Sequence, residues 1–394
     1  MKHKVLVVAG EASADVHAAH IFESLQKKYS LELYGIGGDN LLRLGLKPLA
    51  HAQEMAVVGL TEAISRIPRS LELLRNLEER ALRDRPDFAF LVDLPDFNLR
   101  LAARLKRAGI KVVYFVSPQV WAWRGGRVHS MAKILDLLLC ILPFEKDWYR
   151  RNAPPELHVE YVGHPVVEEI PDLPYQPEEN LVALLPGSRL RELFSLLPVM
   201  LAAAKKILEK YPTARFELPL AAILRGNPKA QELLRAKEGP IADLMRELGD
   251  RLRILEVPAP EVLRRAPLAW VASGTATLET AVVGTPMVVV YKVSSISAFL
   301  FKNFVGYKGP VAMANILHVG LNSPQRILPE LLQGEANAEN LAREALRLLR
   351  DGDAWTEQAK VLATTRALLS AGVGSPTKTI IDKLDRFFVE GASP

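Results

Sequence analysis

The chain has 394 residues, 49% hydrophobic and 24% charged, which is ordinary for a globular protein and long enough for two domains. The single cysteine, Cys140, excludes an internal disulfide and a metal site built from several cysteines. No apolar run reaches the roughly 20 residues that span a bilayer, so the composition favours a cytoplasmic protein.

The formal net charge is +5, but basic residues are concentrated in two stretches without any acid, Leu99–Leu135 and Met287–Met313. Both stretches carry aromatic residues, among them Trp121 and Trp123 in the first and Phe299 in the second. Basic surface implies an anionic partner: nucleic acid, a phosphorylated substrate or lipid headgroups. Solvated basic faces are the alternative. Two such stretches with aromatics favour a functional surface, and the second is the stronger candidate for membrane contact.

The first predicted element is a strand at "KVLVVAG". Basic residues precede this run as in a signal peptide, but the run is brief and Glu11 and Asp15 follow it at once, which favours a strand. Further apolar runs ("LELYGIGG", "DFAFLVDLP", "IKVVYFVSP", "LDLLLCILP") alternate with segments of helical period. This alternation predicts a parallel sheet covered on both faces, with ligands at the carboxyl ends of its strands.

Two turns in this first half carry acids at strand ends. "AGEASAD" lacks the G-x-G-x-x-G spacing of a dinucleotide site, and its Glu11 and Asp15 suit hydroxyl groups better than phosphates. "VDLPDFN" places Asp93 at the end of a strand, where it is a candidate general base if it faces a hydroxyl. Asp96 and Asn98 are better explained as caps of the following helix.

The segment "MAVVGLTEAISRIPRSLELLRNL" places Leu60, Ile64, Ile67, Leu71 and Leu74 on one helical stripe. Such a stripe is more often core. Interleaved arginines leave open the alternative of an interfacial membrane contact.

After a Pro-rich, acidic segment, the second half repeats the alternation, and "LLPGSRLRELF" forms its first strand, turn and helix start. Gly187 allows close backbone approach, Ser188 can cap, and free amides point outward at the positive end of the helix. Arg189 adds a planar cation suited to phosphate. A capped helix with a surface arginine explains the pattern equally well.

"SGTATLE" has the same pattern of strand end, glycine turn and helix start later in the chain. Ser273, Gly274 and Thr275 form the turn, and the amides of Thr275 and Ala276 would face a ligand. Glu279 is one residue too late for a capping box with Thr275, but it could accept hydrogen bonds from ribose hydroxyls. The alternative is an exposed acid near a helix N-terminus. Two such turns in one domain favour a nucleotide diphosphate.

The histidine pattern argues against a metal site, and the serine pattern argues against a serine nucleophile. His17 and His20 lie three residues apart on a predicted helix without a third ligand nearby, and no HExxH motif occurs, so we expect no metal site. His164, in "VGHP", follows a strand and could reach a cleft. Ser188 has no evident base partner and no G-x-S-x-G elbow is present.

An ordered set of motifs covers nearly the whole chain: "GEASAD", "GIGG", "VDLPDFN", "YFVSPQVWAWRGGRV", "LPFEKDWY", "VGHP", "LPGSRLRE", "SGTATLE", "PMVVVYKVS" and "ANIL". Together they resemble the lipid-A-disaccharide synthase family. The resemblance implies a GT-B fold, with two Rossmann-like parallel-sheet domains facing across a cleft. It also implies inverting transfer of 2,3-diacylglucosamine from UDP to the 6-hydroxyl of 2,3-diacylglucosamine 1-phosphate (lipid X), at the cytoplasmic face of the inner membrane.

By position, the resemblance implies roles for several residues. Asp93 matches the family's essential Asp, Arg189 its diphosphate arginine, Ser273–Ala276 with Glu279 its nucleotide turn, Asn315 its Asn and Ser13 the Ser of "GEAS". Departures are also present. The family usually has glycine where Ala14 and Ala18–Ala19 stand, its "PN" is Ala314–Asn315 here, and "LHVGLNSPQRILPE" is unusual after it.

We therefore expect an N-terminal domain over residues 1–168 on the acceptor and membrane side, and a linker over 169–180. A donor-side domain follows over 181–360, with C-terminal helices over 361–394 that cross back to the first domain. The residues expected to bind substrate are Ser13, Glu11, Ser188, Arg189, Ser273, Gly274, Thr275, Ala276, Glu279 and Asn315. We expect no cofactor, no metal and no nucleic acid, and a homodimer is an open possibility. Two rivals stay open: another UDP-sugar enzyme, such as an epimerase or a transferase with a soluble acceptor, and a catalytically silent binding or scaffold protein.

Overall fold

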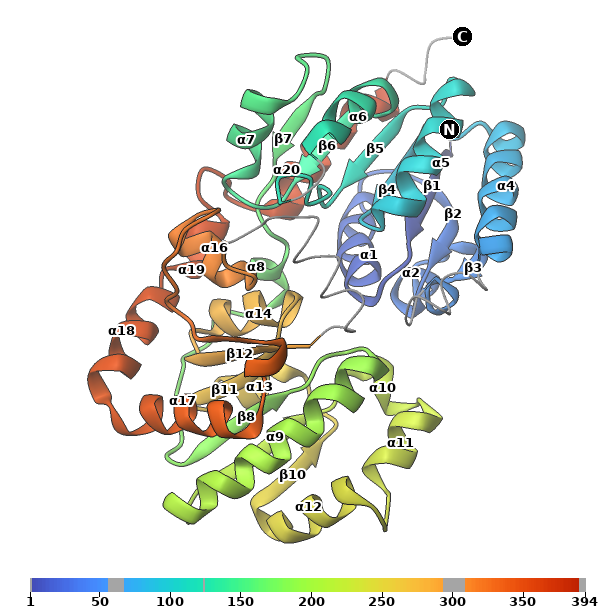
Figure 1. The fold of residues 1–394 in the computed structure, drawn as a ribbon. Coiled ribbons are helices and arrows are strands. Elements are labelled where there is room, and N and C mark those ends of the chain that lie inside the picture. The colour runs from blue at the N-terminus through green and yellow to red at the C-terminus, as the bar shows by residue number, and fades with distance from the viewer. Residues whose placement is uncertain (1, 56–66, 123–124, 293–308, 390–394) are drawn as a thin grey trace. The chain divides into compact units, whose positions relative to one another are not determined.

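The computed structural model describes residues 2–55, 67–122, 125–292 and 309–389. The chain divides into two compact units, which are coloured blue to green with the red C-terminal end, and green to red, in Figure 1. The first unit comprises Met1–Pro165 and Leu369–Pro394, and the second comprises Val166–Leu368. Trp123, Phe299, Leu60 and Ile64, on which the sequence predicted surfaces or a stripe, lie outside the described residues.

A seven-stranded, wholly parallel sheet forms the centre of the first unit, in the order β3-β2-β1-β4-β5-β6-β7. Its strands are β1 (His3–Ala9), β2 (Leu31–Gly37), β3 (Lys47–His51), β4 (Phe88–Val92), β5 (Val112–Phe115), β6 (Leu137–Cys140) and β7 (Val159–Tyr161). Strands β4, β5 and β6 are buried at every residue, as expected for apolar runs covered on both faces.

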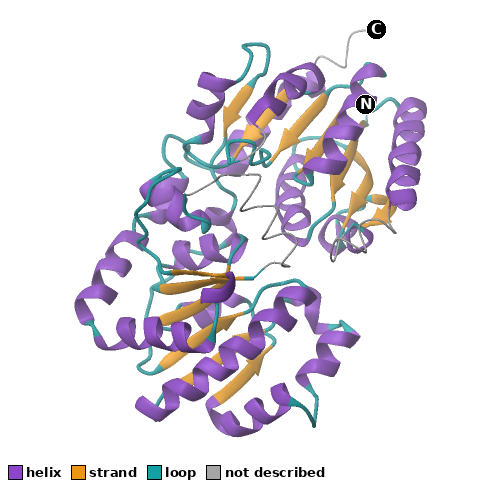
Figure 2. Cartoon of the chain, in the orientation of Figure 1, coloured by secondary structure: helices purple, strands orange, loops and turns teal. Residues whose placement is uncertain are grey.

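Helices lie on both faces of this sheet (Figure 2). They are α1 (Ala12–Gln26), α2 (Asp39–Arg43), η1 (Ala52–Glu54), α4 (Ile67–Asp84), α5 (Pro95–Arg107), η2 (Gly125–Arg127), α6 (Val128–Ile134), α7 (Glu145–Asn152) and α20 (Pro376–Val389). The last of these, α20, comes from the far end of the chain and packs on α1. Phe388 stacks on Tyr29 with ring centroids 4.3 Å apart, and Phe387 lies 5.4 Å from Phe88.

The second unit contains a six-stranded parallel sheet in the order β10-β9-β8-β11-β12-β13. Its strands are β8 (Leu181–Leu185), β9 (Arg215–Pro219), β10 (Leu252–Leu255), β11 (Leu268–Ala272), β12 (Met287–Tyr291) and β13 (Glu330–Leu332). Its helices are α8 (Val166–Glu169), α9 (Leu190–Lys210), α10 (Ala222–Arg225), α11 (Pro228–Leu234), α12 (Pro240–Leu248), η3 (Gly249–Arg251), α13 (Ala259–Leu263), α14 (Thr275–Val283), α16 (Met313–Val319), η5 (Gln333–Glu335), α17 (Ala338–Arg350), α18 (Gly352–Leu362) and α19 (Thr365–Leu369).

The segment that follows α8 runs along the second unit and is hydrogen-bonded to it. Gln176 and Glu178 donate backbone N–H groups to the carbonyls of Arg264 and Arg265, at 3.0 and 2.7 Å. The Tyr175 hydroxyl donates to the carbonyl of Ala266 at 3.0 Å. These bonds fix the chain as it approaches β8.

Each sheet has one point at which the strand order reverses. In the first unit β1 lies between β2 and β4, with Ala9 paired with Val92 at the carboxyl ends. In the second unit β8 lies between β9 and β11, with Leu185 paired with Val271. The expected pair of Rossmann-like parallel sheets is confirmed, and the ligand sites of such sheets lie outside the carboxyl ends of the strands at these reversal points.

Candidate active site

Asp93 is the first residue after β4, at the reversal point of the first unit. Its backbone is held from three sides. Its N–H donates to the Phe115 carbonyl at 2.9 Å, and its own carbonyl accepts the Tyr114 hydroxyl at 2.5 Å and Asn98 Nδ2 at 2.8 Å. The side chain of Asp93 is half-buried. Burial raises the pKa of Tyr114, and the nearby Asp93 carboxylate adds to this rise.

The expected capping role of Asp96 and Asn98 is wrong. Asn98 is fully buried, and its side-chain amide donates to the carbonyls of Val92 and Asp93 instead of accepting from helix amides. Asp96 pairs with Arg127 at 3.2 Å. The helix α5 is started by Pro95 instead, because its fixed φ suits the first helical position.

Three residues at neighbouring strand ends adopt left-handed backbone conformations. Asp93 and Leu94, after β4, have φ of 49° and 51°, and Val116, after β5, has φ of 65°. A β-branched residue in this region is an outlier. Strain of this kind persists only where surrounding contacts determine the conformation, and it concentrates at active sites and ligand clamps.

The turn after β1 lies beside that after β4. A Cβ on Gly10 would lie 2.9 Å from Leu94 Cδ2, so the two strand ends pack tightly. Glu11 occupies the N-cap position of α1, and both Glu11 and Ser13 are half-buried there. These two residues and Asp93 therefore share one edge of the first unit, and their binding of substrate stays a prediction.

Asp15 has a different role from the one its sequence suggested. Its carboxylate is 3% exposed and accepts the backbone amides of Gly38, Asn40 and Leu41 at 2.7 to 3.2 Å. It also accepts Asn40 Nδ2 at 2.8 Å. The hydrogen bonds of the Asp15 carboxylate therefore fix the start of α2, which is a structural role.

At the reversal point of the second unit, Gly187, Ser188 and Arg189 connect β8 to α9. Gly187 has φ of 109°, and a Cβ there would lie 2.1 Å from Glu192 Oε2. Ser188 is exposed and precedes the N-cap position, which Arg189 occupies. The Arg189 side chain is 60% exposed, with Nη1 3.6 Å from Glu192 Oε1.

Ser273 and Gly274 connect the adjacent strand β11 to α14. Gly274 has φ of 147° at the N-cap position, and Thr275 and Ala276 form the first turn of the helix. Thr277 is fully buried, and its hydroxyl donates to the Gly274 carbonyl at 2.8 Å, which fixes the turn. Glu279 is half-buried one turn further along. Because β8 pairs with β11, the starts of α9 and α14 lie at one edge, where two sets of helix amides can meet an anion.

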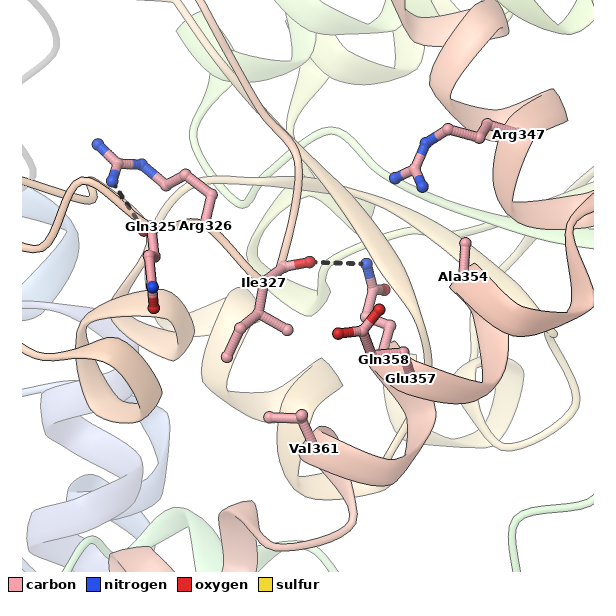
Figure 3. A pocket seen from close by; sticks show the side chains of 8 residues that line it. All are labelled: Gln325, Arg326, Ile327, Arg347, Ala354, Glu357, Gln358 and Val361. Atoms are coloured by element: carbon pink, nitrogen blue, oxygen red, sulfur yellow. Dashed lines mark hydrogen bonds between the residues drawn. The ribbon is translucent and has the colours of Figure 1, made fainter.

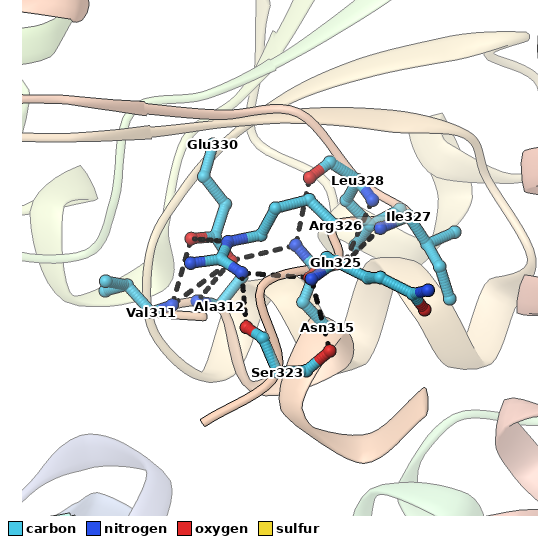
Figure 4. A network of polar contacts seen from close by, with 9 residues as sticks. All are labelled: Val311, Ala312, Asn315, Ser323, Gln325, Arg326, Ile327, Leu328 and Glu330. Atoms are coloured by element: carbon cyan, nitrogen blue, oxygen red, sulfur yellow. Dashed lines mark hydrogen bonds and ion pairs between the residues drawn. The ribbon is translucent and has the colours of Figure 1, made fainter. Parts of the chain in front are cut away.

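Asn315 lies on α16 and is completely buried (Figure 4). Its Nδ2 donates to the Leu328 carbonyl at 2.9 Å and to Glu330 Oε1 at 2.8 Å. Its Oδ1 accepts the backbone amides of Ile327 and Leu328 at 3.0 and 2.9 Å. The hydrogen-bonding capacity of this amide is thus filled by the chain itself.

Glu330 continues the same network. It is 3% exposed at its side chain, accepts the amides of Val311 and Ala312 at 2.9 Å, and lies 3.4 Å from Arg326 Nε. Asn315 and Glu330 together therefore tie the segment before α16 to the segment before β13.

Sequence reasoning did not single out Glu145, although it lies in the quoted "LPFEKDWY". It is 1% exposed and accepts Trp121 Nε1 at 3.0 Å and the amides of Ile141 and Leu142 at 3.2 and 3.0 Å. Burial raises the pKa of Glu145 to about 7, despite these donors. An acid at the end of the apolar run "LLLCILPF" was the only signal of it in the sequence.

His164 is 3% exposed, and its ring meets that of His17 edge-on at a centroid distance of 6.2 Å. Burial, with a smaller contribution from His17, lowers the pKa of His164 to about 3. Among the described residues, no group of three or more His, Cys, Asp or Glu side chains could hold a metal ion.

A separate hollow of about 550 Å³ lies in the second unit (Figure 3). Its lining residues are Gln325, Arg326, Ile327, Arg347, Ala354, Glu357, Gln358 and Val361. Gln358 Oε1 accepts the amide of Met287, the first residue of β12, at 2.5 Å. The hollow therefore lies near the amino ends of the strands, at the edge opposite to the candidate site.

In the part of the chain that the structure describes, no helix is both long and apolar enough to cross a membrane. Phe194 on α9 and Leu71 on α4 are exposed apolar side chains at 45% and 42%.

The chain is similar to known proteins over nearly its whole length. A family model described as lipid-A-disaccharide synthetase matches residues 5–380. A lipid-A-disaccharide synthase from Anaeromyxobacter dehalogenans (strain 2CP-1 / ATCC BAA-258) is 42% identical over 376 residues, covering 93% of each chain.

Solved structures share the fold at low sequence identity. UDP-GlcNAc 2-epimerase from Neisseria meningitidis, bound to UDP-GlcNAc, matches with a TM-score of 0.62 and 14% identity, over 98% of this chain and all of that one. The glycotransferase of kitacinnamycin matches with a TM-score of 0.59 and 13% identity, over 98% of both chains. The fold is thus of the GT-B type, and the chain belongs to the lipid-A-disaccharide synthetase family of glycosyltransferases.

Proposed function

We propose that the protein transfers 2,3-diacylglucosamine from UDP to the 6-hydroxyl of lipid X, with inversion, giving a β-1′,6-linked disaccharide 1-phosphate and UDP. Family membership supports the overall reaction. One observation supports assigning the acceptor to the first unit and the UDP donor to the second. The candidate residues at the reversal point of the first unit include acids, whereas those at the reversal point of the second unit include helix amides.

The second unit would bind the UDP donor. The amides at the starts of α9 and α14 point beyond the sheet edge, and Arg189 supplies an exposed guanidinium beside them. These groups would stabilise the charge that develops on the leaving diphosphate, and they are in place before the reaction. Glu279, one turn into α14, would accept hydrogen bonds from the ribose.

The first unit would hold the acceptor. Asp93 would remove the proton of the attacking acceptor hydroxyl. The hydroxyl oxygen would form the new bond to C1 of the donor sugar while the bond from C1 to the diphosphate breaks. Tyr114 and Asn98 donate hydrogen bonds to the backbone carbonyl of Asp93. These bonds fix the main chain of Asp93 and so help to position its carboxylate. Glu11 and Ser13 would bind acceptor hydroxyls beside it.

Contact with the cytoplasmic face of the inner membrane is part of the proposal. Leu71 is exposed on α4, and the exposed Arg75 lies one helical turn further along, whereas Arg69 pairs with Glu54 and Glu72 at 2.9 and 3.0 Å. Apolar insertion and attraction to anionic headgroups act together at such a surface.

One assay tests the reaction: UDP release from acylated and non-acylated UDP-glucosamine donors, with and without lipid X. We expect release only with the diacylated donor and lipid X together. Turnover of plain UDP-GlcNAc would support a soluble-substrate UDP-sugar enzyme instead. UDP binding with no release under any of these conditions would support a binding protein.

A further inference from the structure

The segment from Val116 to Ala122 follows β5 and is held by one face of α7. The Ser117 and Tyr149 hydroxyl oxygens are 2.7 Å apart, and the Tyr149 hydroxyl also lies 3.2 Å from the Pro118 carbonyl. Tyr149 is 1% exposed, so these bonds are made in the interior. They fix the chain directly after Val116, whose left-handed backbone needs such support.

Glu145, one helical turn before Tyr149, holds the far end of the same segment. One oxygen accepts Trp121 Nε1, and the other accepts the amides of Ile141 and Leu142 after β6. The Trp121 ring also meets Phe144 edge-on, at a centroid distance of 5.2 Å. A buried carboxylate is stable only when it is hydrogen-bonded, and these three donors supply the bonds that Glu145 needs.

The segment borders the strand end that carries Asp93. Tyr114 and Phe115, immediately before it, bond to the carbonyl and the amide of Asp93. Beyond it, Arg127 pairs with Asp96, three residues after Asp93. Trp121 is half-buried between these two attachments.

We propose that Glu145 is a positioning residue: by holding Trp121, it fixes residues 116–122 as one wall of the acceptor-sugar site beside Asp93. This rests on the proposed function. Glu145 itself is 1% exposed and acts through Trp121, whose indole is the part that meets the acceptor. Residues that orient a functional side chain by hydrogen bonding change activity by about 10- to 100-fold when they are removed, as is known for the residues that hydrogen-bond to metal ligands.

The test is a double-mutant cycle of Glu145→Gln and Trp121→Phe, with Glu160→Gln as control. Trp121→Phe keeps an aromatic ring but removes the five-membered ring with its N–H, and it leaves Glu145 bonded to the amides of Ile141 and Leu142. Glu160 is a partly exposed acid that pairs with Lys146 at 2.9 Å and with Lys383 at 3.1 Å, both outside residues 116–122, so its change should leave kcat/KM for lipid X unaltered. The readouts are kcat/KM for lipid X, KM for the donor, UDP affinity and the melting temperature.

We expect each single variant to lower kcat/KM for lipid X by about 10- to 100-fold, with UDP affinity within twofold of the unaltered protein. The double variant should be no worse than the worse single variant, because the carboxylate acts through the indole. Unchanged kcat/KM in Trp121→Phe, additive losses, or a parallel loss of UDP affinity would overturn the inference. If the unaltered protein turns over no lipid X, the proposed function fails first, and the inference fails with it.

Discussion

Single residues at the two reversal points determine what the protein can do, and Asp93 is the clearest case. Its strained backbone is imposed by neighbours 5 and 21 residues away in sequence, Asn98 and Tyr114. The sequence could identify Asp93 as a strand-end acid. It could not identify the two side chains that orient it, because both contacts depend on how the strand ends pack.

Asp93→Asn tests the general-base assignment. We expect turnover to fall by about 100- to 10,000-fold, since the amide cannot take up the hydroxyl proton, while UDP affinity is retained. Steady-state rates and calorimetric UDP binding measure the two effects. Asp147→Asn, an exposed acid on α7 that pairs with Arg150, is the control. Near-normal turnover in Asp93→Asn would show that Asp93 is not the base.

Glu279→Ala tests the ribose assignment. Removing a charged acceptor costs about 1.5–3 kcal/mol of binding, so UDP affinity should fall by roughly 10- to 100-fold. Glu261→Ala, an exposed acid on α13 of the same unit, should leave UDP affinity unchanged. Equal affinities of the two variants, measured by calorimetry, would remove Glu279 from the site.

Asn315 marks the limit of residue-level prediction. Matching by motif suggested a substrate ligand, and that role is still a prediction. The four hydrogen bonds of its side chain go to residues 12 to 15 positions later, a distance at which no local pattern shows the pairing. On this geometry we favour an effect on substrate through the order of the 311–330 region.

At the level of elements, strand–turn–helix connections were the most predictable feature. Parallel strands buried on both faces read as continuous apolar runs, so β8 and β11 were evident in the sequence. Glycine then indicated where the backbone must turn, at Gly187 and Gly274. The strand order was not evident, because nothing local in the sequence states which strand pairs with which.

Gly187→Ala tests the tight turn between β8 and α9. A left-handed backbone costs a non-glycine residue about 1–2 kcal/mol, and the added methyl would also displace Glu192. The free energy of unfolding in urea should fall by at least this amount, and UDP affinity should fall with it. Gly226→Ala is the matched control, because its φ is −92° and nothing lies within 4 Å of the added carbon. A variant as stable as this control would contradict the geometry of the turn.

At the scale of the whole molecule, the buried imidazole of His164 links stability to pH. Its pKa is lowered from 6.5 to about 3, chiefly by burial and then by His17, so the folded protein resists a proton that the unfolded chain accepts. The stabilisation is fully present above pH 6.5 and is lost as pH falls towards 3. The slope contributed by one such group is up to about 1.4 kcal/mol per pH unit.

Urea unfolding of His164→Gln at several pH values measures this link. We expect the variant to lose less stability than the unaltered protein between pH 6.5 and pH 4. His129→Gln, a change of an exposed histidine on α6, should follow the unaltered protein. Parallel curves for His164→Gln and the unaltered protein would show that His164 does not carry the effect.

The return of α20 to the first unit has a consequence for the order of folding. Phe88 is completely buried, and its ring centroid lies 5.4 Å from that of Phe387 and 5.2 Å from that of Phe388, so the core of the first unit includes α20. During synthesis, the residues that begin the first unit leave the ribosome long before those that finish it. The second unit, Val166–Leu368, is a continuous stretch that can be completed in between. We therefore expect the usual N-terminal-first order to be reversed: the unit whose synthesis begins first should be the last to close.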